Sequence, residues 1–427
     1  MTILIKNIDY IDIDSEKTIK NSNILVKDGI FSKISKGEIK DLDNENLDII
    51  DGKNMLMMPG LINAHTHMGM CSLRNYADDT SLFDWLSNHI WPAEAKLTDE
   101  DIYWSTKLNI AEMFLSGTTC FNDMYYFPKH IYKAVDESKI RGVITRAVLD
   151  VGGEGDLRFE EAIDFYKFVQ KENNELIKFF MAPHAIYTCT KEYLKLVIDY
   201  CKKEDIPIHI HLSETEKEVN DCLKEHNMTP LNYIESLGML DLHVVAAHCT
   251  HLTDEEILKI RDKDFYPVYN VSSNLKLASG FTPIKKMQSN NIQIAMGTDS
   301  SSSNNNQNMF EEMHLGSLVN KALNSDPTAT KASEIIKMAT INGAKALGFD
   351  NLGKIEEGYD ADFILIDLDK AHLMPRNNDI ASIVYSMQGA DVDSLCIKGE
   401  MVLKNRELLT IDYEKAKFEV NKIINKF

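Results

Sequence analysis

The alternation of short apolar or β-branched runs with helical stretches, between residues 57 and 351, most constrains the fold of this 427-residue chain. Strands are predicted at 57–62, 118–122, 143–149, 178–182, 207–211, 244–248, 266–271 and 293–296. Helices with apolar residues three to four apart are predicted at 159–171, 191–203, 216–225 and 254–261. Over about 295 residues this pattern predicts an α/β fold, a (β/α)8 TIM barrel with insertions, although a doubly wound open sheet would alternate in the same way. No Gly-x-Gly-x-x-Gly or Gly-x-x-x-x-Gly-Lys-Ser/Thr element follows the first strand, which disfavours the nucleotide-binding open sheets.

Both ends of the chain have the pattern of β-structure. Residues 24–26 and 30–34, joined by Lys27-Asp28-Gly29, predict a hairpin, and 395–397 with 401–403 predict another. A further strand is predicted at 361–367. Because neither end holds enough strands for a stable sheet, we expect a small β-sandwich domain built from residues 1–56 and 352–427, beside a barrel domain of residues 57–351.

Composition excludes several classes of partner. The 46 Lys and Arg residues against 66 Asp and Glu give a net charge of −20, so nucleic acid and acidic membrane surfaces are not expected partners. No apolar run reaches the ~20 residues of a membrane span, and the N-terminus lacks the layout of a secretion signal. Seven scattered cysteines predict reduced thiols in a cytoplasmic protein. A homo-oligomer is compatible with the sequence, which leaves the oligomeric state open.

Unusual polar residues fall at or near the carboxyl ends of the predicted strands. They are His65, His67, Asp123, Arg146, His184, His209, His211, Glu214, His248 and Asp299. His65 and His67 follow an apolar run and are two residues apart, so in a strand both side chains would face the same side. In a closed barrel these strand ends converge on one mouth, where such barrels carry their chemistry. Taken alone, His209 or His243 is better interpreted as a packing histidine.

The motifs resemble those of the amidohydrolase superfamily, specifically the 5-methylthioadenosine/S-adenosylhomocysteine deaminases. The resemblance covers essentially the whole chain and rests on His65-x-His67, on 207–214 (PIHIHLSE), on Ala247-His248-Cys249 and on Gly297-Thr298-Asp299. Trp85 with Glu94, Arg146 with Arg158, and Ala182-Pro183-His184 match the substrate-binding residues of these deaminases. Atrazine-type chlorohydrolases and guanine deaminases share the metal motifs and are the nearest alternatives.

The resemblance implies that His65, His67, His211 and Asp299 bind one divalent metal, zinc, with ferrous iron as the alternative. Three imidazoles and a carboxylate suit either ion and leave a position for water. Relatives with two metals use a bridging lysine at the end of the fourth strand. Residues 181–184 supply no lysine here, so a single metal is expected. Without the other ligands, Asp299 would be interpreted as a loop or helix-capping carboxylate.

The catalytic residues implied by the resemblance are Glu214, His248 and Asp299. Glu214 is expected to protonate the purine ring nitrogen, His248 to polarise the attacking water, and Asp299 to pass a proton from water to the leaving amine. The alternative for Glu214 is a first-turn helix carboxylate, because Ser213-x-x-Glu216 has the pattern of a capping box. His251 is better interpreted as the lead-in to a helix capped by Thr253.

The substrate-binding residues implied by the resemblance are Trp85, Glu94, Arg146, Arg158 and His184. Trp85 would stack on the purine and Glu94 would bind the ribose hydroxyls, although each also fits a structural role in or near a helix. Arg146, in an apolar strand, and Arg158, in a glycine-rich loop, would bind the carboxylate of a homocysteine tail. Residues 272–274 are expected to line the pocket, and the polar segment 300–308 is expected to be a loop near the mouth.

We therefore expect a metal-dependent hydrolase that deaminates adenosine-type nucleosides: 5′-methylthioadenosine, S-adenosylhomocysteine or adenosine. The products would be ammonia and an inosine-type nucleoside. A triazine hydrolase or a guanine-type deaminase is the alternative with the same metal centre. A non-enzymatic scaffold is disfavoured because such proteins usually lack metal ligands, whereas every expected ligand is present here. The sequence does not rank the three nucleosides.

Overall fold

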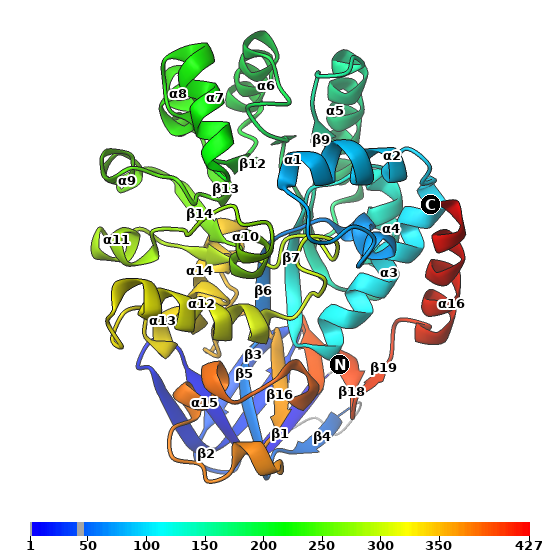
Figure 1. Cartoon of the computed structure of the whole chain (residues 1–427). Coiled ribbons are helices and arrows are strands. Elements are labelled where there is room, and N and C mark those ends of the chain that lie inside the picture. The colour runs from blue at the N-terminus through cyan, green and yellow to red at the C-terminus, as the bar shows by residue number, and fades with distance from the viewer. Residues whose placement is uncertain (1, 41–46) are drawn as a thin grey trace.

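One assembly of strands is built from both ends of the chain. The computed structural model describes residues 2–40 and 47–427. A nine-stranded sheet lies at the bottom of Figure 1. Its strands are β1 (Thr2–Asp12), β2 (Lys17–Lys27), β3 (Ile30–Ser35), β4 (Leu47–Asp51), β5 (Met55–Pro59), β16 (Phe363–Asp367), β17 (Val392–Ile397), β18 (Glu400–Lys404) and β19 (Glu407–Leu408). The predicted hairpins are confirmed, because β2 pairs antiparallel with β3 and β17 pairs antiparallel with β18.

The two ends of the chain meet where β5 pairs antiparallel with β16, with Pro59 opposite Phe363. The sheet is covered on one side by a buried cluster that includes Ile3 and Ile5 from β1, Val26 from β2 and Leu365 from β16. These branched aliphatic side chains occupy alternate positions along their strands, as expected for a sheet with one face packed on a core.

A second group of strands, running through the middle of the molecule, pairs only in parallel. They are β6 (Leu61–Thr66), β7 (Thr118–Asp123), β8 (Arg141–Ile144), β9 (Ala147–Val148), β10 (Ile177–Phe179), β11 (Ala182–Pro183), β12 (Ile208–Leu212), β13 (Val244–His248), β14 (Phe265–Tyr269) and β15 (Ala295–Met296). They form sheets in the orders β6-β7-β8-β10, β9-β11 and β12-β13-β14-β15. A bridge between Met181 and Ile208 joins the fourth predicted strand to the fifth.

The end of the last strand lies beside the first. The Asp299 amide donates a hydrogen bond to the His65 carbonyl at 2.9 Å. Gly297 permits this approach, because a Cβ at that position would lie 2.7 Å from the His65 nitrogen. A buried cluster contains Ala64, Val143, Val245 and Val268, small and β-branched side chains from different parallel strands. This mixed α/β arrangement fits a fold of the TIM-barrel type.

Helices surround the parallel strands (Figure 1). They are α1 (Leu82–Asp84), α2 (Trp91–Glu94), α3 (Asp99–Leu115), α4 (Pro128–Ser138), α5 (Gly155–Glu172), α6 (Lys191–Glu204), α7 (Glu216–His226), α8 (Pro230–Ser236), α9 (Asp254–Ile260), α10 (Val271–Lys276), α11 (Ile284–Ser289), α12 (Met309–Asn324), α13 (Ala332–Met338), α14 (Ile341–Ala346), α15 (Asp379–Tyr385) and α16 (Tyr413–Ile423). Short 3₁₀ segments are η1 (Met68–Leu73), η3 (Met239–Asp241), η4 (Ala371–Leu373), η5 (Gly389–Asp391) and η6 (Ile424–Lys426), and η2 (Trp85–Ile90) is a π-helix. In α6 the buried side chains Leu194, Val197, Ile198 and Cys201 repeat every three to four residues, and the Thr190 hydroxyl caps the helix.

Several predicted strand bounds were wrong. The segment 57–62 is two strands, β5 and β6, which belong to different sheets and are separated by Gly60. A Cβ on Gly60 would lie 2.1 Å from the Thr119 hydroxyl, so the chain can cross there only with glycine. The segments 143–149 and 178–182 are each broken into two short strands, and 293–296 shrinks to β15. An apolar run does not reveal where ladder hydrogen bonds stop, which explains these differences.

Two further local predictions were wrong. Helix α5 begins at Gly155, so Arg158 lies on a helix and not in a loop. Helix α7 is capped by Thr215, whose hydroxyl accepts from the Glu218 amide, and not by Ser213. By contrast, the capping box predicted for Thr253 and Glu256 is confirmed at the start of α9.

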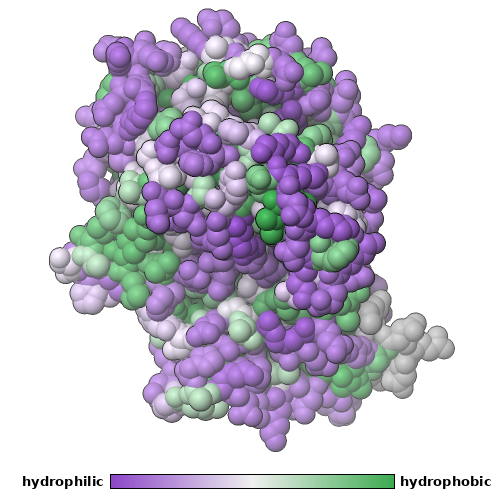
Figure 2. All heavy atoms as spheres, turned by 45° about the vertical axis from the view of Figure 1, so that its right-hand side comes forward, coloured by the Kyte–Doolittle hydropathy of each residue, from purple (hydrophilic) through white to green (hydrophobic). Residues whose placement is uncertain are grey.

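A helix that crosses a bilayer must be both long and apolar. Within residues 2–40 and 47–427, none of the helices combines the length and apolar character that crossing a bilayer requires. The face shown in Figure 2 is mainly hydrophilic, with hydrophobic side chains gathered in separate areas.

Candidate metal centre and active site

Five predicted site residues, from the ends of four strands, lie close together. His65 lies in β6 and His67 follows it, His211 lies in β12, His248 ends β13, and Asp299 follows β15. The candidate ligand atoms of His65, His67 and His211 all lie within 4.8 Å of one another, and so do those of His65, His248 and Asp299. His248 and Asp299 have φ values of 73° and 62°, in the left-handed region that few non-glycine residues adopt.

Three distances within this cluster are those expected between neighbouring ligands of one cation. Asp299 Oδ1 lies 3.4 Å from His65 Nε2 and 3.2 Å from His67 Nε2. His67 Nε2 lies 3.4 Å from His211 Nε2. Metal–ligand bonds of roughly 2.0–2.1 Å in a tetrahedron place the ligand atoms roughly 3.3 Å apart. His65 Nε2 is buried and makes no hydrogen bond to any residue that the structure describes, so the donor set is suited to a divalent metal.

Hydrogen bonds behind the rings turn the Nε2 atoms toward the cluster. His67 Nδ1 donates to the Met124 carbonyl at 2.6 Å, and His211 Nδ1 donates to the His184 carbonyl at 2.8 Å. These bonds leave the lone pairs on Nε2, the atom that faces the other ligands. Burial also lowers the pKa of His65 to about 4 and that of His211 well below its ordinary value, which keeps both rings neutral.

Two side chains of helix α10 make hydrogen bonds to predicted catalytic residues. The Ser273 hydroxyl donates to Asp299 Oδ2 at 2.6 Å, and the Ser300 amide donates to Oδ1 at 2.7 Å. His248 Nδ1 donates to Asn274 Oδ1 at 2.9 Å. Residues 272–274, expected to line the pocket, are not among its lining residues; Ser273 and Asn274 instead lie behind Asp299 and His248 and orient them.

Glu214 lies beside His248 at the end of β12. It is buried, its Oε1 accepts from the Ser279 hydroxyl at 3.3 Å, and its Oε2 lies 3.8 Å from His248 Nε2. Burial raises the pKa of Glu214, which favours the protonated form that a proton donor needs. The Glu218 carboxylate accepts from the Glu214 amide at 2.7 Å and so fixes the backbone there.

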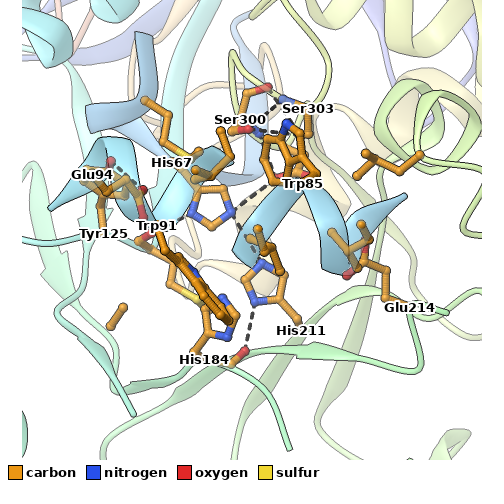
Figure 3. Close-up of a pocket in the computed structure, with 18 of the residues that line it drawn as sticks. His67, Trp85, Trp91, Glu94, Tyr125, His184, His211, Glu214, Ser300 and Ser303 are labelled. Atoms are coloured by element: carbon orange, nitrogen blue, oxygen red, sulfur yellow. Dashed lines mark hydrogen bonds and ion pairs between the residues drawn. The ribbon is translucent and has the colours of Figure 1, made fainter. Parts of the chain in front are cut away.

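A pocket of about 60 Å³ opens onto the cluster. Glu94 and Tyr125 lie on one side of it and Glu214 on the other, with His67 and His211 between them (Figure 3). The Tyr125 hydroxyl donates to Glu94 at 2.7 Å, and burial raises the pKa of Glu94 to about 7. Trp85, predicted as either a base-stacking residue or helix core, is 5% exposed and lines this pocket from η2.

A larger cavity of about 880 Å³ adjoins this pocket and shares Trp91, Glu94 and Tyr126 with it. Both predicted arginines line it, and each is paired with a carboxylate. Arg146 donates to Glu161 through Nε at 2.9 Å and lies over the Tyr126 ring at 5.1 Å. Arg158 donates to the Leu149 carbonyl at 3.0 Å and lies 3.4 Å from Glu154.

The polar segment 300–308 lies beside the site, with Ser300 and Ser303 lining the pocket and Gln307 fully buried. Gln307 Oε1 accepts from Asn63, Thr66 and Thr298, at 3.1, 3.1 and 2.9 Å.

The sequence did not predict Gln307 as a site residue, nor Trp91 and Tyr125, which line the pocket. A polar residue just past a strand end was the one signal available for Tyr125, which follows β7. His251 donates to the Ser279 carbonyl at 2.6 Å and lies outside the ligand clusters, as predicted.

Comparison with known proteins places this site in a family. The model of the amidohydrolase family matches residues 56–402. The chain belongs to the amidohydrolase family. This family member is 44% identical to a 5-methylthioadenosine/S-adenosylhomocysteine deaminase of Caldanaerobacter subterraneus subsp. tengcongensis, over 99% of this chain and 98% of that protein. It is 45% identical to a 5′-deoxyadenosine deaminase of Methanocaldococcus jannaschii, over 93% of this chain and 94% of that protein.

Solved structures agree with the family assignment. An adenosine deaminase from Xanthomonas campestris with bound zinc aligns with this amidohydrolase at a TM-score of 0.93 and 30% identity, over 99% of this chain and 98% of that one. A guanine deaminase from C. acetobutylicum aligns at a TM-score of 0.82 and 22% identity, over 94% of this chain and 100% of that one, which shows the shared fold alone. The resemblance predicted from the motifs is confirmed.

Proposed function

We propose that this protein is a metal-dependent hydrolase that deaminates adenosine-type nucleosides: 5′-methylthioadenosine, S-adenosylhomocysteine, 5′-deoxyadenosine or adenosine. The observation that carries the proposal is the position of buried Glu214 beside His248, next to the cluster of three imidazoles and Asp299. A proton donor beside a cation site is what the exchange of an aromatic amino group for a water oxygen requires. Relatives over 40% identical across nearly the whole chain are named as deaminases of such nucleosides.

We propose that His65, His67, His211 and Asp299 hold a single zinc ion, with ferrous iron as the alternative. Support comes from the donor set and from the ligand spacing of 3.2–3.4 Å. No lysine stands near the end of the fourth strand to bridge a second metal. When bound, such an ion lowers the pKa of a water molecule from 15.7 to about 7.

In the proposed reaction, Glu214 donates its proton to the purine ring nitrogen as water adds to the neighbouring carbon. His248, held by Asn274, stabilises the charge that develops there. Asp299 takes one proton from the water and passes it to the amino group, which leaves as ammonia. The second proton of the water restores Glu214, so the atoms balance and the enzyme ends unchanged.

The nucleoside would lie in the pocket with its base against Trp85 and near His184. Glu94 would accept hydrogen bonds from the ribose hydroxyls in place of the present bond from Tyr125. Because a buried carboxylate can accept from ribose hydroxyls that a free base lacks, this pocket supports a nucleoside better than a free ring.

An ammonia-release assay of the metal-replete protein tests the proposal. The substrates are 5′-methylthioadenosine, S-adenosylhomocysteine, 5′-deoxyadenosine and adenosine, with adenine, guanine and a chlorotriazine for comparison. We expect turnover of nucleosides that exceeds that of adenine at least about tenfold, since the ribose bonds to Glu94 are lost with the free base. Turnover of guanine or of the triazine alone would contradict the proposal.

We propose that Arg146 and Arg158 bind the tail of the substrate. Replacing Arg146 with alanine is expected to raise KM for S-adenosylhomocysteine about ten- to a hundredfold and to change KM for methylthioadenosine little. A charge-assisted pair with the tail carboxylate is worth roughly 1.5–3 kcal/mol, which sets this range. Steady-state kinetics on both substrates checks the prediction.

Glu161 supplies a matched control of opposite sign. Its Oε2 pairs with the Arg146 guanidinium, 2.9 Å from Nε and 2.9 Å from a terminal nitrogen. The Glu161 side chain itself is 48% exposed. Glu161→Gln is therefore expected to free the guanidinium and lower KM for S-adenosylhomocysteine. Equal effects of both variants on the two substrates would show that Arg146 does not bind the tail.

We also propose that the parallel strands close into an eight-stranded barrel and that the nine-stranded sheet forms a separate β-sandwich domain. The hydrogen bond from Asp299 to the His65 carbonyl supports closure between the last strand and the first. The boundary expected between residues 56 and 57 falls inside β5, so we move it to Gly60.

We propose a cytoplasmic location for the protein. The seven buried free thiols support it.

A further inference from the structure

The three imidazoles of the cluster are oriented in two different ways. The Nδ1 atoms of His67 and His211 donate to backbone carbonyls, of Met124 and His184. The Nδ1 of His65 instead lies 2.8 Å from a side-chain atom, Nε2 of His209. Backbone carbonyls are present whatever side chain stands there, so His65 is the one ring whose orientation depends on the identity of another residue.

His209 is placed for this contact by the geometry of its strand. It lies on β12 two residues before His211, so both side chains leave the same face of the strand. Both His65 and His209 are 0% exposed, and their rings meet edge to face with centroids 5.0 Å apart. The Nδ1 atom of His65 is shielded from bulk solvent, and its hydrogen-bonding position is occupied by His209 Nε2.

The chemistry of ligation fixes the direction of this hydrogen bond. A ring nitrogen that binds a cation carries no proton, so a His65 that binds through Nε2 must carry its proton on Nδ1. That proton needs an acceptor, and His209 Nε2 is the atom within reach. His209 then carries its own proton on Nδ1.

We propose that His209 is a positioning residue, whose Nε2 accepts the proton of His65 Nδ1 and so holds the lone pair of His65 Nε2 toward the metal site. The inference rests on the ligand assignment in the proposed function. It replaces the interpretation of His209 as a packing histidine. A ring that only fills space would not have to place a hydrogen-bond acceptor beside His65 Nδ1. Loss of such a partner typically weakens metal binding 10–100-fold.

The test replaces His209 with a side chain that retains a hydrogen-bond acceptor for His65 Nδ1, and separately with one that only fills a similar volume. In His209→Gln the amide oxygen reaches about the place of Nε2, whereas His209→Met fills the space without an acceptor. His243→Gln is the matched control, since His243 lies outside the ligand clusters and donates to the Ala346 carbonyl at 2.7 Å. Dissociation constants for Zn²⁺ and Co²⁺ are measured by competition with a chelating dye, together with the absorption spectrum of the Co²⁺ form.

We expect H209M to bind both ions about 10–100-fold more weakly, with an altered Co²⁺ spectrum, and H209Q to stay within about threefold of wild type. H243Q should match wild type. Unchanged affinity in H209M, or equal weakening in H209M and H209Q, would overturn the proposal, because the ring would then only fill space. If H209M does not fold, H209N takes its place, since its amide is one carbon too short to reach His65. Affinity is measured without substrate, so a failed deamination assay leaves this result intact.

Discussion

Replacing His211 with alanine is expected to remove the bound metal and to lower kcat/KM for the best nucleoside by more than about a thousandfold. Loss of a residue behind a ligand costs roughly 10–100-fold in metal affinity, and loss of a ligand itself costs more. His211 also faces His67, with 3.4 Å between their Nε2 atoms, so its removal opens one side of the cluster. Metal content per chain and nucleoside turnover are the two measurements.

The fold should survive this change. The hydrogen bonds of β12 to β13 at this position are made by backbone atoms, which alanine keeps. The free energy of unfolding of the metal-free variant is therefore expected to lie within about 1–3 kcal/mol of that of the metal-free wild type. His226→Ala is the control, because His226 lies outside the ligand clusters, at the end of α7. Full metal stoichiometry in H211A would refute the ligand assignment.

The position of the site could be predicted from the sequence because it depends on strand periodicity. Two histidines separated by one residue must share a face, and parallel strands bring their carboxyl ends to one edge. With the expected barrel, these two rules bring His65, His67 and His211 together, and the structure places the three side chains in one cluster. The hairpins at both ends were predictable for a similar reason, since turn residues stand between alternating apolar runs.

Contacts between side chains distant in sequence could not be predicted. Nothing in the order of residues shows that Glu161 occupies Arg146 or that His209 lies behind His65. Each is one of many polar residues, and packing of separate elements decides which pairs meet. The strand break at Gly60 was missed for a related reason: β5 and β6 form one apolar run and differ only in the sheet that they join.

Replacing Glu214 with glutamine is expected to lower kcat about 10²–10⁴-fold, the usual contribution of a general acid. Glutamine keeps the shape and can accept from Ser279, but it has no carboxylic proton for the ring nitrogen. Glu214 is not among the candidate ligand groups, so metal content should stay at the wild-type value. KM should change little, because substrate binding is assigned to other side chains, among them Trp85, Glu94 and Arg146.

Glu216→Gln separates this role from that of a helix-start carboxylate. Glu216 is exposed in the first turn of α7, two residues from Glu214, and interacts with the same helix terminus. A purely structural carboxylate at either position would change stability by about 0.3–1 kcal/mol and leave kcat nearly untouched. We therefore expect kcat to fall in E214Q and to remain at the wild-type value in E216Q, with similar melting temperatures for both. A kcat for E214Q within tenfold of wild type would leave the ring nitrogen without its proposed proton donor, and the deaminase mechanism would need another acid.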